Sequence, residues 1–434
     1  MPLFENPDES AYSVTIKSDR IVSGVRNTPE YQDDDSSAIY RMLVENLKPV
    51  DFSYYLKRYL YRAAGYRKEF GEVSEEEYLA TMTEAFSSRG VPASLKPSST
   101  RPRAAFRNWL TRKTVSREAV ILLGFGLDMK LDDVNDFMTK ALQESRLNPK
   151  DPVETVCWYC LKNHLGYYQF RRLLTAYEEL PGSPETEEKI MLTGTRILRT
   201  EVEDIRDEKT LMRYLNQLRR IDGKSRQSVE ARTLFLQLYE EAREQIAALN
   251  NSIEDQQAEV GMERLKDRLS RDDRLYDEQK QDQIRRMSGQ KKQWKKEDIT
   301  PVNFEEVLFS AVPRDRNGNL LPMKGSSLNE QFRGKRLNRQ HIQEILDGTG
   351  TINRYDLATI SFFVLSQRPD LEENSVRRYR TFMDETDEIL DRCGMGKLYV
   401  ANPYEAFLMI CMLSDYPLGT YADVWEFSYE EEEG

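Results

Sequence analysis

The chain has 434 residues, of which 39% are hydrophobic and 32% are charged. This length has room for roughly two or three domains, each large enough to bury its own core. No apolar run approaches the ~20 residues of a membrane-spanning helix, and the acidic start MPLFENPDES lacks the features of a secretory signal. Four cysteines do not make a disulfide framework, so we expect a cytoplasmic protein.

The formal net charge of -11 argues against a surface that is basic overall and coats nucleic acid. It does not exclude a local basic surface, because the field at a docking site is set within a Debye length of about 8–10 Å. Charge therefore has to be considered segment by segment.

The first part of the chain predicts a mobile arm, 1–37, followed by a helical domain, 38–183. The segment 51–66 is a helix dense in aromatic residues, which form either core or a surface for a protein partner. Ser74 and Glu77 have the spacing of a capping box and predict the start of the next helix. The run Pro181-Gly-Ser-Pro184 marks a domain boundary near residue 183.

The remainder of the chain has three parts. Residues 184–299 are heavily charged with long helical patterns, which predicts a helical insertion or linker that is also a possible contact for a protein partner. Residues 300–429 predict a second helical domain. The chain finishes in an acidic tail, 430–434.

One stretch occurs twice in diverged form, at 104–129 and at 340–366. Both copies predict a helix, a short polar break and a second, apolar helix that begins at a Ser or Asn cap. The match continues to a pair of cysteines, so we call 104–160 the first repeat and 340–411 the second repeat. The paired residues that carry the match are Arg117 and Arg354, Phe125 and Phe362, Pro152 and Pro403, Glu154 and Glu405, and Cys160 and Cys411.

Where Leu346-Asp-Gly348 is followed by Thr351-Ile-Asn-Arg354 and an apolar helix, the chain resembles the lambda-repressor-like (Xre) helix-turn-helix family of bacterial regulators. The resemblance implies an all-α fold with two helix-turn-helix-like units, about 74–142 and about 302–366, separated by the charged insertion. The helices that it implies for the first unit are 76–88, a weak one near 93–95, 102–110, 117–127 and 131–142. For the second unit they are 304–311, 327–333, 338–346 and 354–365.

Basic residues cluster where the resemblance places each recognition helix and the turn before it. Residues 92–117 contain no acid, and 324–339 contain only Glu330. We assign the first basic cluster to the first repeat and the second basic cluster to the second repeat. Arginine and lysine bind phosphates, while Asn, Gln and Arg read base edges from a helix in the major groove. The candidate DNA-binding residues are Arg101, Arg103, Arg107, Arg112, Lys113, Arg333, Lys335, Arg336, Asn338, Arg339, Gln340 and Gln343.

These observations predict a regulator of transcription that binds double-stranded DNA. The alternative is a helical interaction or adaptor protein whose units keep the shape without the contacts. The two hypotheses differ in what they expect of the arginines. DNA binding requires continuous basic surfaces, whereas arginines held in intramolecular ion pairs favour the adaptor.

Enzymatic signals are poor. The only histidines, His164 and His341, exclude an HExxH motif and most histidine-based metal sites. Cys157 and Cys160 form a lone CxxC on an apolar helix, without the strand-helix context of a redox motif. We therefore expect core cysteines, no catalytic residues, no metal and no cofactor.

Overall fold

The computed structural model describes residues 39–40, 51–96, 101–184, 193, 195–270, 293–321, 332, 334–372, 374–399 and 402–430. Within these ranges all regular structure is helical, apart from isolated bridges such as the one between Ser183 and Arg220. The predicted all-α class is therefore confirmed. None of the described helices combines the length and the apolar character needed to cross a membrane.

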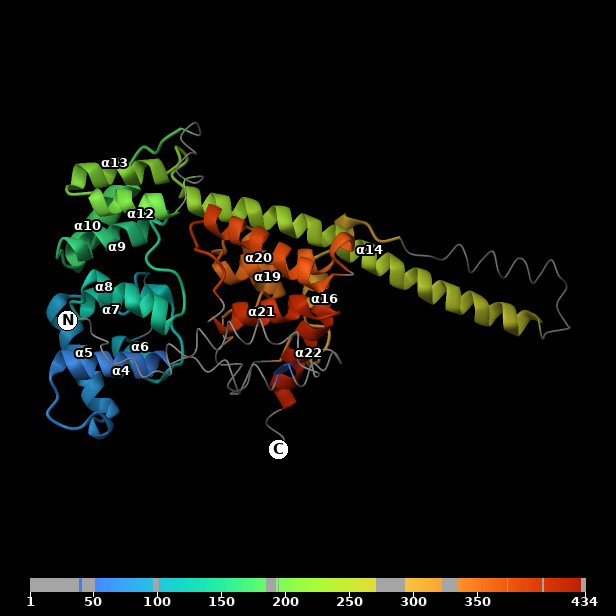
Figure 1. Cartoon of the computed structure of the whole chain (residues 1–434), viewed down its shortest axis with the longest axis horizontal. Helices are drawn as coiled ribbons and strands as arrows, with labels where there is room; N and C mark the ends of the chain where they lie inside the picture. The colour runs from blue at the N-terminus through green and yellow to red at the C-terminus, as the bar shows by residue number, and fades with distance from the viewer. Residues whose placement is uncertain are drawn as a thin grey trace.

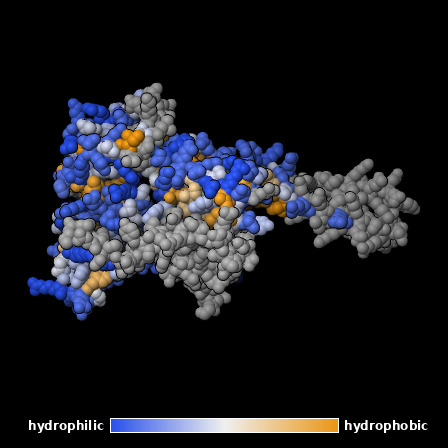
Figure 2. Space-filling view, in the orientation of Figure 1, coloured by the Kyte–Doolittle hydropathy of each residue, from blue (hydrophilic) through white to orange (hydrophobic). Residues whose placement is uncertain are grey.

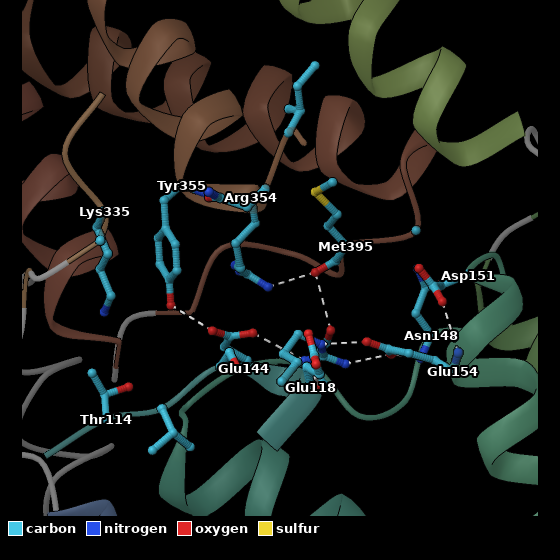
Figure 3. A pocket seen from close by; sticks show the side chains of 18 of the residues that line it. Thr114, Glu118, Glu144, Asn148, Asp151, Glu154, Lys335, Arg354, Tyr355 and Met395 are labelled. Atoms are coloured by element: carbon cyan, nitrogen blue, oxygen red, sulfur yellow. Dashed lines mark hydrogen bonds and ion pairs between the residues drawn. The ribbon is translucent and has the colours of Figure 1, made fainter. Parts of the chain in front are cut away.

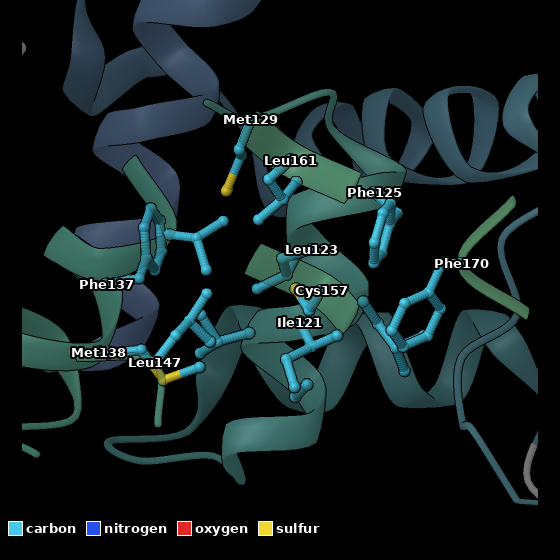
Figure 4. Close-up of a cluster of buried hydrophobic side chains, with 14 of the residues drawn as sticks. Ile121, Leu123, Phe125, Met129, Phe137, Met138, Leu147, Cys157, Leu161 and Phe170 are labelled. Atoms are coloured by element: carbon cyan, nitrogen blue, oxygen red, sulfur yellow. The ribbon is translucent and has the colours of Figure 1, made fainter. Parts of the chain in front are cut away.

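The helices that precede residue 219 gather around one hydrophobic core. Phe137 lies among the rings of the aromatic helix, with centroids 5.9 Å from Phe52, 4.8 Å from Tyr55 and 5.5 Å from Tyr59, so one face of this helix packs in the core. Figure 4 shows how Ile121 and other apolar side chains meet there. The elements are α4 (Phe52–Ala64), η1 (Phe70–Glu72), α5 (Glu75–Arg89), α6 (Pro102–Thr111), α7 (Arg117–Gly126), α8 (Leu131–Asp136), the π-helical turn η2 (Phe137–Ala141), α9 (Pro152–Lys162), α10 (Tyr167–Glu178), α12 (Thr195–Asp204) and α13 (Glu208–Leu218).

The start of α5 is the predicted capping box: Glu77 N–H lies 3.4 Å from Ser74 Oγ, and Ser74 N–H donates to the Glu77 carboxylate at 2.9 Å. The second helix of the helix-turn-helix unit, expected near 93–95, is not formed. Residues 91–96 contain no helix, and Leu95 N–H instead donates to Glu118 at 2.6 Å. The proline at position 92 and the proline after Lys96 favour extended backbone over a helical turn.

A second hydrophobic core contains the rest of the described elements. α19 is buried along its whole length and packs against α14, α20, α21 and α22. The elements are α14 (Arg226–Ser270), η4 (Lys296–Asp298), α16 (Pro301–Leu308), α18 (Arg339–Leu346), α19 (Arg354–Ser366), η5 (Pro369–Leu371), α20 (Ser375–Arg392), α21 (Pro403–Leu413) and α22 (Pro417–Glu430).

The charged segment 184–299 does not stand apart from the two cores. Apolar side chains of α12 and α13, such as Leu198 and Leu211, belong to the first core, which thus extends past the boundary predicted near residue 183. The first half of α14 packs Phe235 and Ile246 into the second core, and its second half extends beyond the other labelled helices (Figure 1). Periodic apolar positions every three or four residues make this burial possible despite the high charge of the segment.

Ile39 and Tyr40 also pack in the second core, although the sequence assigned 38–183 to the first domain. The centroid of the Tyr40 ring lies 6.1 Å from that of Phe427.

The predicted arm 1–37 and residues 431–434 of the acidic tail lie outside the described residues, as does the expected helix 327–333 except at Phe332. The described surface in the view of Figure 2 is mainly hydrophilic, with small, separate hydrophobic patches.

Candidate functional site

The two repeats contain the same ion pair, which is buried in the second repeat and partly buried in the first. Arg117 donates from Nε to Glu154 Oε1 at 2.7 Å and from a terminal nitrogen to Oε2 at 2.7 Å. Arg354 binds Glu405 in the same two-pronged way, at 2.6 and 2.9 Å. Such planar, bidentate pairs are strong and fix geometry as well as energy. Each pair joins the start of one helix, α7 or α19, to the start of another, α9 or α21.

The polar groups around each ion pair are also repeated. Arg117 donates to the carbonyls of Ser145 and Arg146, and Arg354 to those of Met395 and Lys397. The glutamate accepts the backbone N–H six residues before it in both repeats, at 2.6 and 2.7 Å. The segments 145–148 and 395–399 are thus tied to their helices by equivalent hydrogen bonds.

These equivalent segments meet each other at the contact between the repeats. Ser145 Oγ donates to the Met395 carbonyl at 3.3 Å, and Lys150 Nζ donates to the Asp391 carbonyl at 2.6 Å. Gly394 has a φ of +68°, and a Cβ there would lie 2.5 Å from Asn148 Oδ1. Like surfaces in contact are typical of a two-fold, isologous interface, here formed within one chain.

Glu144 connects the two repeats directly. It accepts from Arg117 at 3.2 Å and from the Tyr355 hydroxyl at 2.9 Å (Figure 3). Burial opposes its ionisation, but the charges of Arg117 and Arg354 hold the pKa of Glu144 below its usual value. An ionised Glu144 therefore holds Arg117 of one repeat and Tyr355 of the other together.

A cavity of about 780 Å³ lies at this contact (Figure 3). The loop after α6, the first turns of α7 and α19, and the segment before α18 form its walls. Its polar walls carry both charges, and Val115, Ile352 and Met395 add apolar surface. The charged lining residues are Arg112, Lys113, Arg117, Lys335 and Arg354, and Glu118, Glu144, Asp151 and Glu154.

The predicted DNA-binding residues of the first repeat lie on and around α6, and most are exposed. Arg103 and Arg107 each donate to Glu76 at 2.8 Å, in ion pairs that are more than half exposed. The side chains of Arg101 and Arg112 are exposed and form no hydrogen bond or ion pair with any described residue. Lys113 is half-buried and lines the cavity.

In the second repeat the side chains of the candidates bind other parts of the protein. Lys335 is buried, with its ammonium 4.6 Å from the centroid of the Tyr355 ring. Arg336 lies against three aromatic rings and donates to Tyr429 Oη at 2.8 Å, while Arg339 binds Asn319.

The remaining three described candidates bind residues of their own helix. Asn338 caps α18 by accepting His341 N–H at 2.9 Å. Gln340 and Gln343 donate to the acids four residues further on, Glu344 and Asp347. Arg333 lies outside the described residues. None of the described candidates in the second repeat is an arginine or lysine with a fully exposed, unengaged side chain.

The four cysteines are all buried, as expected. Burial raises the pKa of Cys160 to about 12, so its thiol is a poor nucleophile and a poor metal ligand at neutral pH. Among the described residues, no group of three or more His, Cys, Asp or Glu side chains could hold a metal ion.

Two features of the site were not identified from the sequence. Asn108 is exposed beside Arg107 on α6, and the alternation of exposed residues with buried Phe106 and Trp109 could have placed it on the outer face. Lys335 belongs to the cavity rather than to the outer surface, which no local pattern indicates.

Comparisons of this chain with protein-family models, with curated proteins and with solved structures each found no match.

Proposed function

We propose that the protein binds double-stranded DNA through α6, and that the second repeat supports the first without contacting DNA. The observation that carries this proposal is the exposed face of α6, where Arg103 and Arg107 share a single bound carboxylate, Glu76, and Arg101 is exposed at the N-terminal end. On the opposite face Phe106, Trp109 and Leu110 are buried, so the helix is held by its apolar side.

The dimensions and chemistry of α6 suit the major groove. Ten helical residues span about 15 Å, and the groove is about 12 Å wide. Arg101 and Arg103, at the N-terminal end, are placed for phosphates, while Arg107 and Asn108 have side chains that read guanine and adenine. The pairs with Glu76 are exposed to solvent and therefore weak, so phosphates can replace that carboxylate.

The missing helix at 91–96 sets this unit apart from a complete helix-turn-helix. We infer that α5 and α4, which both pack on α6, hold the recognition helix instead. The second repeat keeps the ion pair of Arg354 and Glu405 but uses its basic residues internally, so its role is to brace the first repeat.

A mobility-shift assay with mixed double-stranded genomic fragments tests the proposal. We expect retarded complexes at about 50 mM salt that disappear as salt rises, because phosphate contacts release counterions. Arg103→Gln/Arg107→Gln should weaken binding. The matched control is Arg368→Gln/Arg377→Gln, since these arginines also share one carboxylate, that of Asp370, and it should bind normally. Absence of complexes at about 50 mM salt would contradict DNA binding and favour the adaptor.

A further inference from the structure

Lys335 is a buried cation whose ammonium has no hydrogen-bonded partner among the described residues. The residue is 8% exposed, and its ammonium end points into the cavity between the repeats (Figure 3). The ammonium forms no ion pair with any described residue either. It makes a cation–π contact with the Tyr355 ring. A buried ammonium costs free energy unless an anion and acceptors surround it.

The acids near the cavity do not supply that anion. Glu144 and Glu154 each bind Arg117, and Glu118 accepts from Leu95 N–H. The charge of Glu144 favours the ammonium of Lys335, yet burial outweighs it and lowers the pKa of Lys335 to about 8. The side chain therefore sits where positive charge is incompletely neutralised.

Two equivalent helices begin at the same cavity. Ser116 and Asn353 cap α7 and α19, and both line it together with Arg117 and Arg354. The first backbone N–H groups of a helix have no partner within it, and no hydrogen bond joins the N–H of Arg117 or Arg354 to another described residue. The positive ends of two helix dipoles thus add to the positive charge of Lys335 at the cavity.

The donors come from three separate segments, and the cavity is larger than one inorganic ion requires. A carboxylate has two oxygens, which one arginine can saturate, whereas a phosphate group has three terminal oxygens that accept from several directions. A volume of about 780 Å³ falls in the range of pockets that bind organic ligands, and Val115 and Ile352 offer apolar contact.

We propose that the cavity between the repeats binds a small organic phosphate of nucleotide size, with Lys335 and Arg112 holding its phosphate. The first turns of α7 and α19 add backbone donors, and the apolar wall contacts the organic part. This binding does not depend on DNA binding, because neither Lys335 nor the two helix starts belong to the exposed face of α6.

Thermal unfolding and calorimetry of the full chain with ATP, AMP, inorganic pyrophosphate and adenosine test the proposal. We expect the first two to bind and to raise Tm, and adenosine to have no effect at the same concentration. Lys335→Met should lower the affinity at least tenfold. Lys209→Met, at an exposed lysine on α13 that does not line the cavity, should leave it unchanged. No response to any phosphate, or an undiminished response in Lys335→Met, would overturn the proposal.

A second measurement uses the unaltered protein, in case Lys335→Met fails to fold. Because its pKa is about 8, Lys335 is expected to react with an acylating reagent at mildly alkaline pH faster than an ordinary lysine, as long as the reagent enters the cavity. Peptide mass analysis should show that ATP or AMP protects Lys335 and not Lys209. Equal labelling of Lys335 with and without both nucleotides would contradict the site.

Discussion

Arg354 and Glu405 form an ion pair in the second core, with the arginine side chain 6% exposed and the glutamate side chain 0% exposed. The two residues are 51 positions apart in the sequence and join the first turns of α19 and α21. The pair between Arg117 and Glu154 occupies the equivalent place in the first repeat. The paired residues also bind the segments 145–148 and 395–399 by hydrogen bonds, and those segments form the contact between the repeats.

Replacing Arg354 by leucine should be among the most destabilising single changes in the chain. It leaves the buried Glu405 carboxylate without its cation, which costs about 3–5 kcal/mol. Denaturant unfolding measures this loss. The double variant Arg354→Leu/Glu405→Leu should lose less, because no charge is left unpaired. Arg368→Leu removes ion pairs with the exposed carboxylates Asp370 and Glu385 and should lower the free energy of unfolding far less. Equal losses for Arg354→Leu and Arg368→Leu would contradict this account.

Gly394→Ala should weaken the contact between the repeats. A Cβ at this position lies 2.5 Å from Asn148 Oδ1 and 2.8 Å from Lys150 Cβ, and the φ of +68° adds strain. Gly65→Ala is the matched control, because Gly65 has a φ of +62° and nothing within 4 Å of its Cβ. We expect the control to lose about 1–2 kcal/mol of unfolding free energy, because of backbone strain. Gly394→Ala should lose roughly a further 1–3 kcal/mol because of the clash. Equal losses in urea unfolding would show that the interface between the repeats tolerates the extra atom.

We expect the stability of the protein to depend on pH through Asp151. Burial and the charge of Glu154 raise the pKa of Asp151 to about 7. The unfolded carboxyl titrates near 3.9, roughly, so between about pH 4 and 7 the folded protein keeps a proton that the unfolded chain has released. This group's contribution to stability is therefore present at low pH and is lost as the pH rises toward 7.

Asp151→Asn should consequently raise Tm at pH 8 more than at pH 5. The cap should survive, because Asn402 fills the equivalent position and accepts from Glu405 N–H. Asp207→Asn is the control. Asp207 also caps a helix, but hydrogen bonds from Thr210 lower its pKa, so its contribution is present at neutral pH and the variant should gain nothing at pH 8. A loss of stability in Asp151→Asn at pH 8 would contradict the assigned pKa.

Sequence patterns predicted what depends on neighbours in the chain. The Ser74 and Glu77 capping box and the caps Ser116 and Asn353 start their helices in the structure, because cap chemistry is decided within four residues. The sequence match also paired Arg117 with Arg354, and in the structure these two arginines make equivalent contacts. Pairing each with its glutamate required the fold, since the partners are 37 and 51 residues away.

Sequence patterns did not predict which side chains are buried by residues far away in the chain. Lys335 and Arg336 lie in a basic run that resembles a solvent-exposed surface, yet packing against Tyr355 and Trp425 places both in the interior or at its edge. The charged composition of 184–299 likewise concealed the periodic apolar residues, such as Phe235, that join it to a core. Composition counts charges, whereas burial depends on which side of a helix carries them.

The salt dependence of DNA affinity tests the central proposal, that α6 and not α18 binds DNA. Fluorescence anisotropy with a labelled duplex gives the slope of log K against log salt, which changes by about 0.9 for each phosphate that the protein no longer neutralises. Arg101→Gln/Arg103→Gln should make the slope shallower by the equivalent of roughly two phosphates, while Arg339→Gln/Gln343→Ala on α18 should leave it unchanged. An unchanged slope in the α6 variant, or a shallower one in the α18 variant, would contradict the proposal.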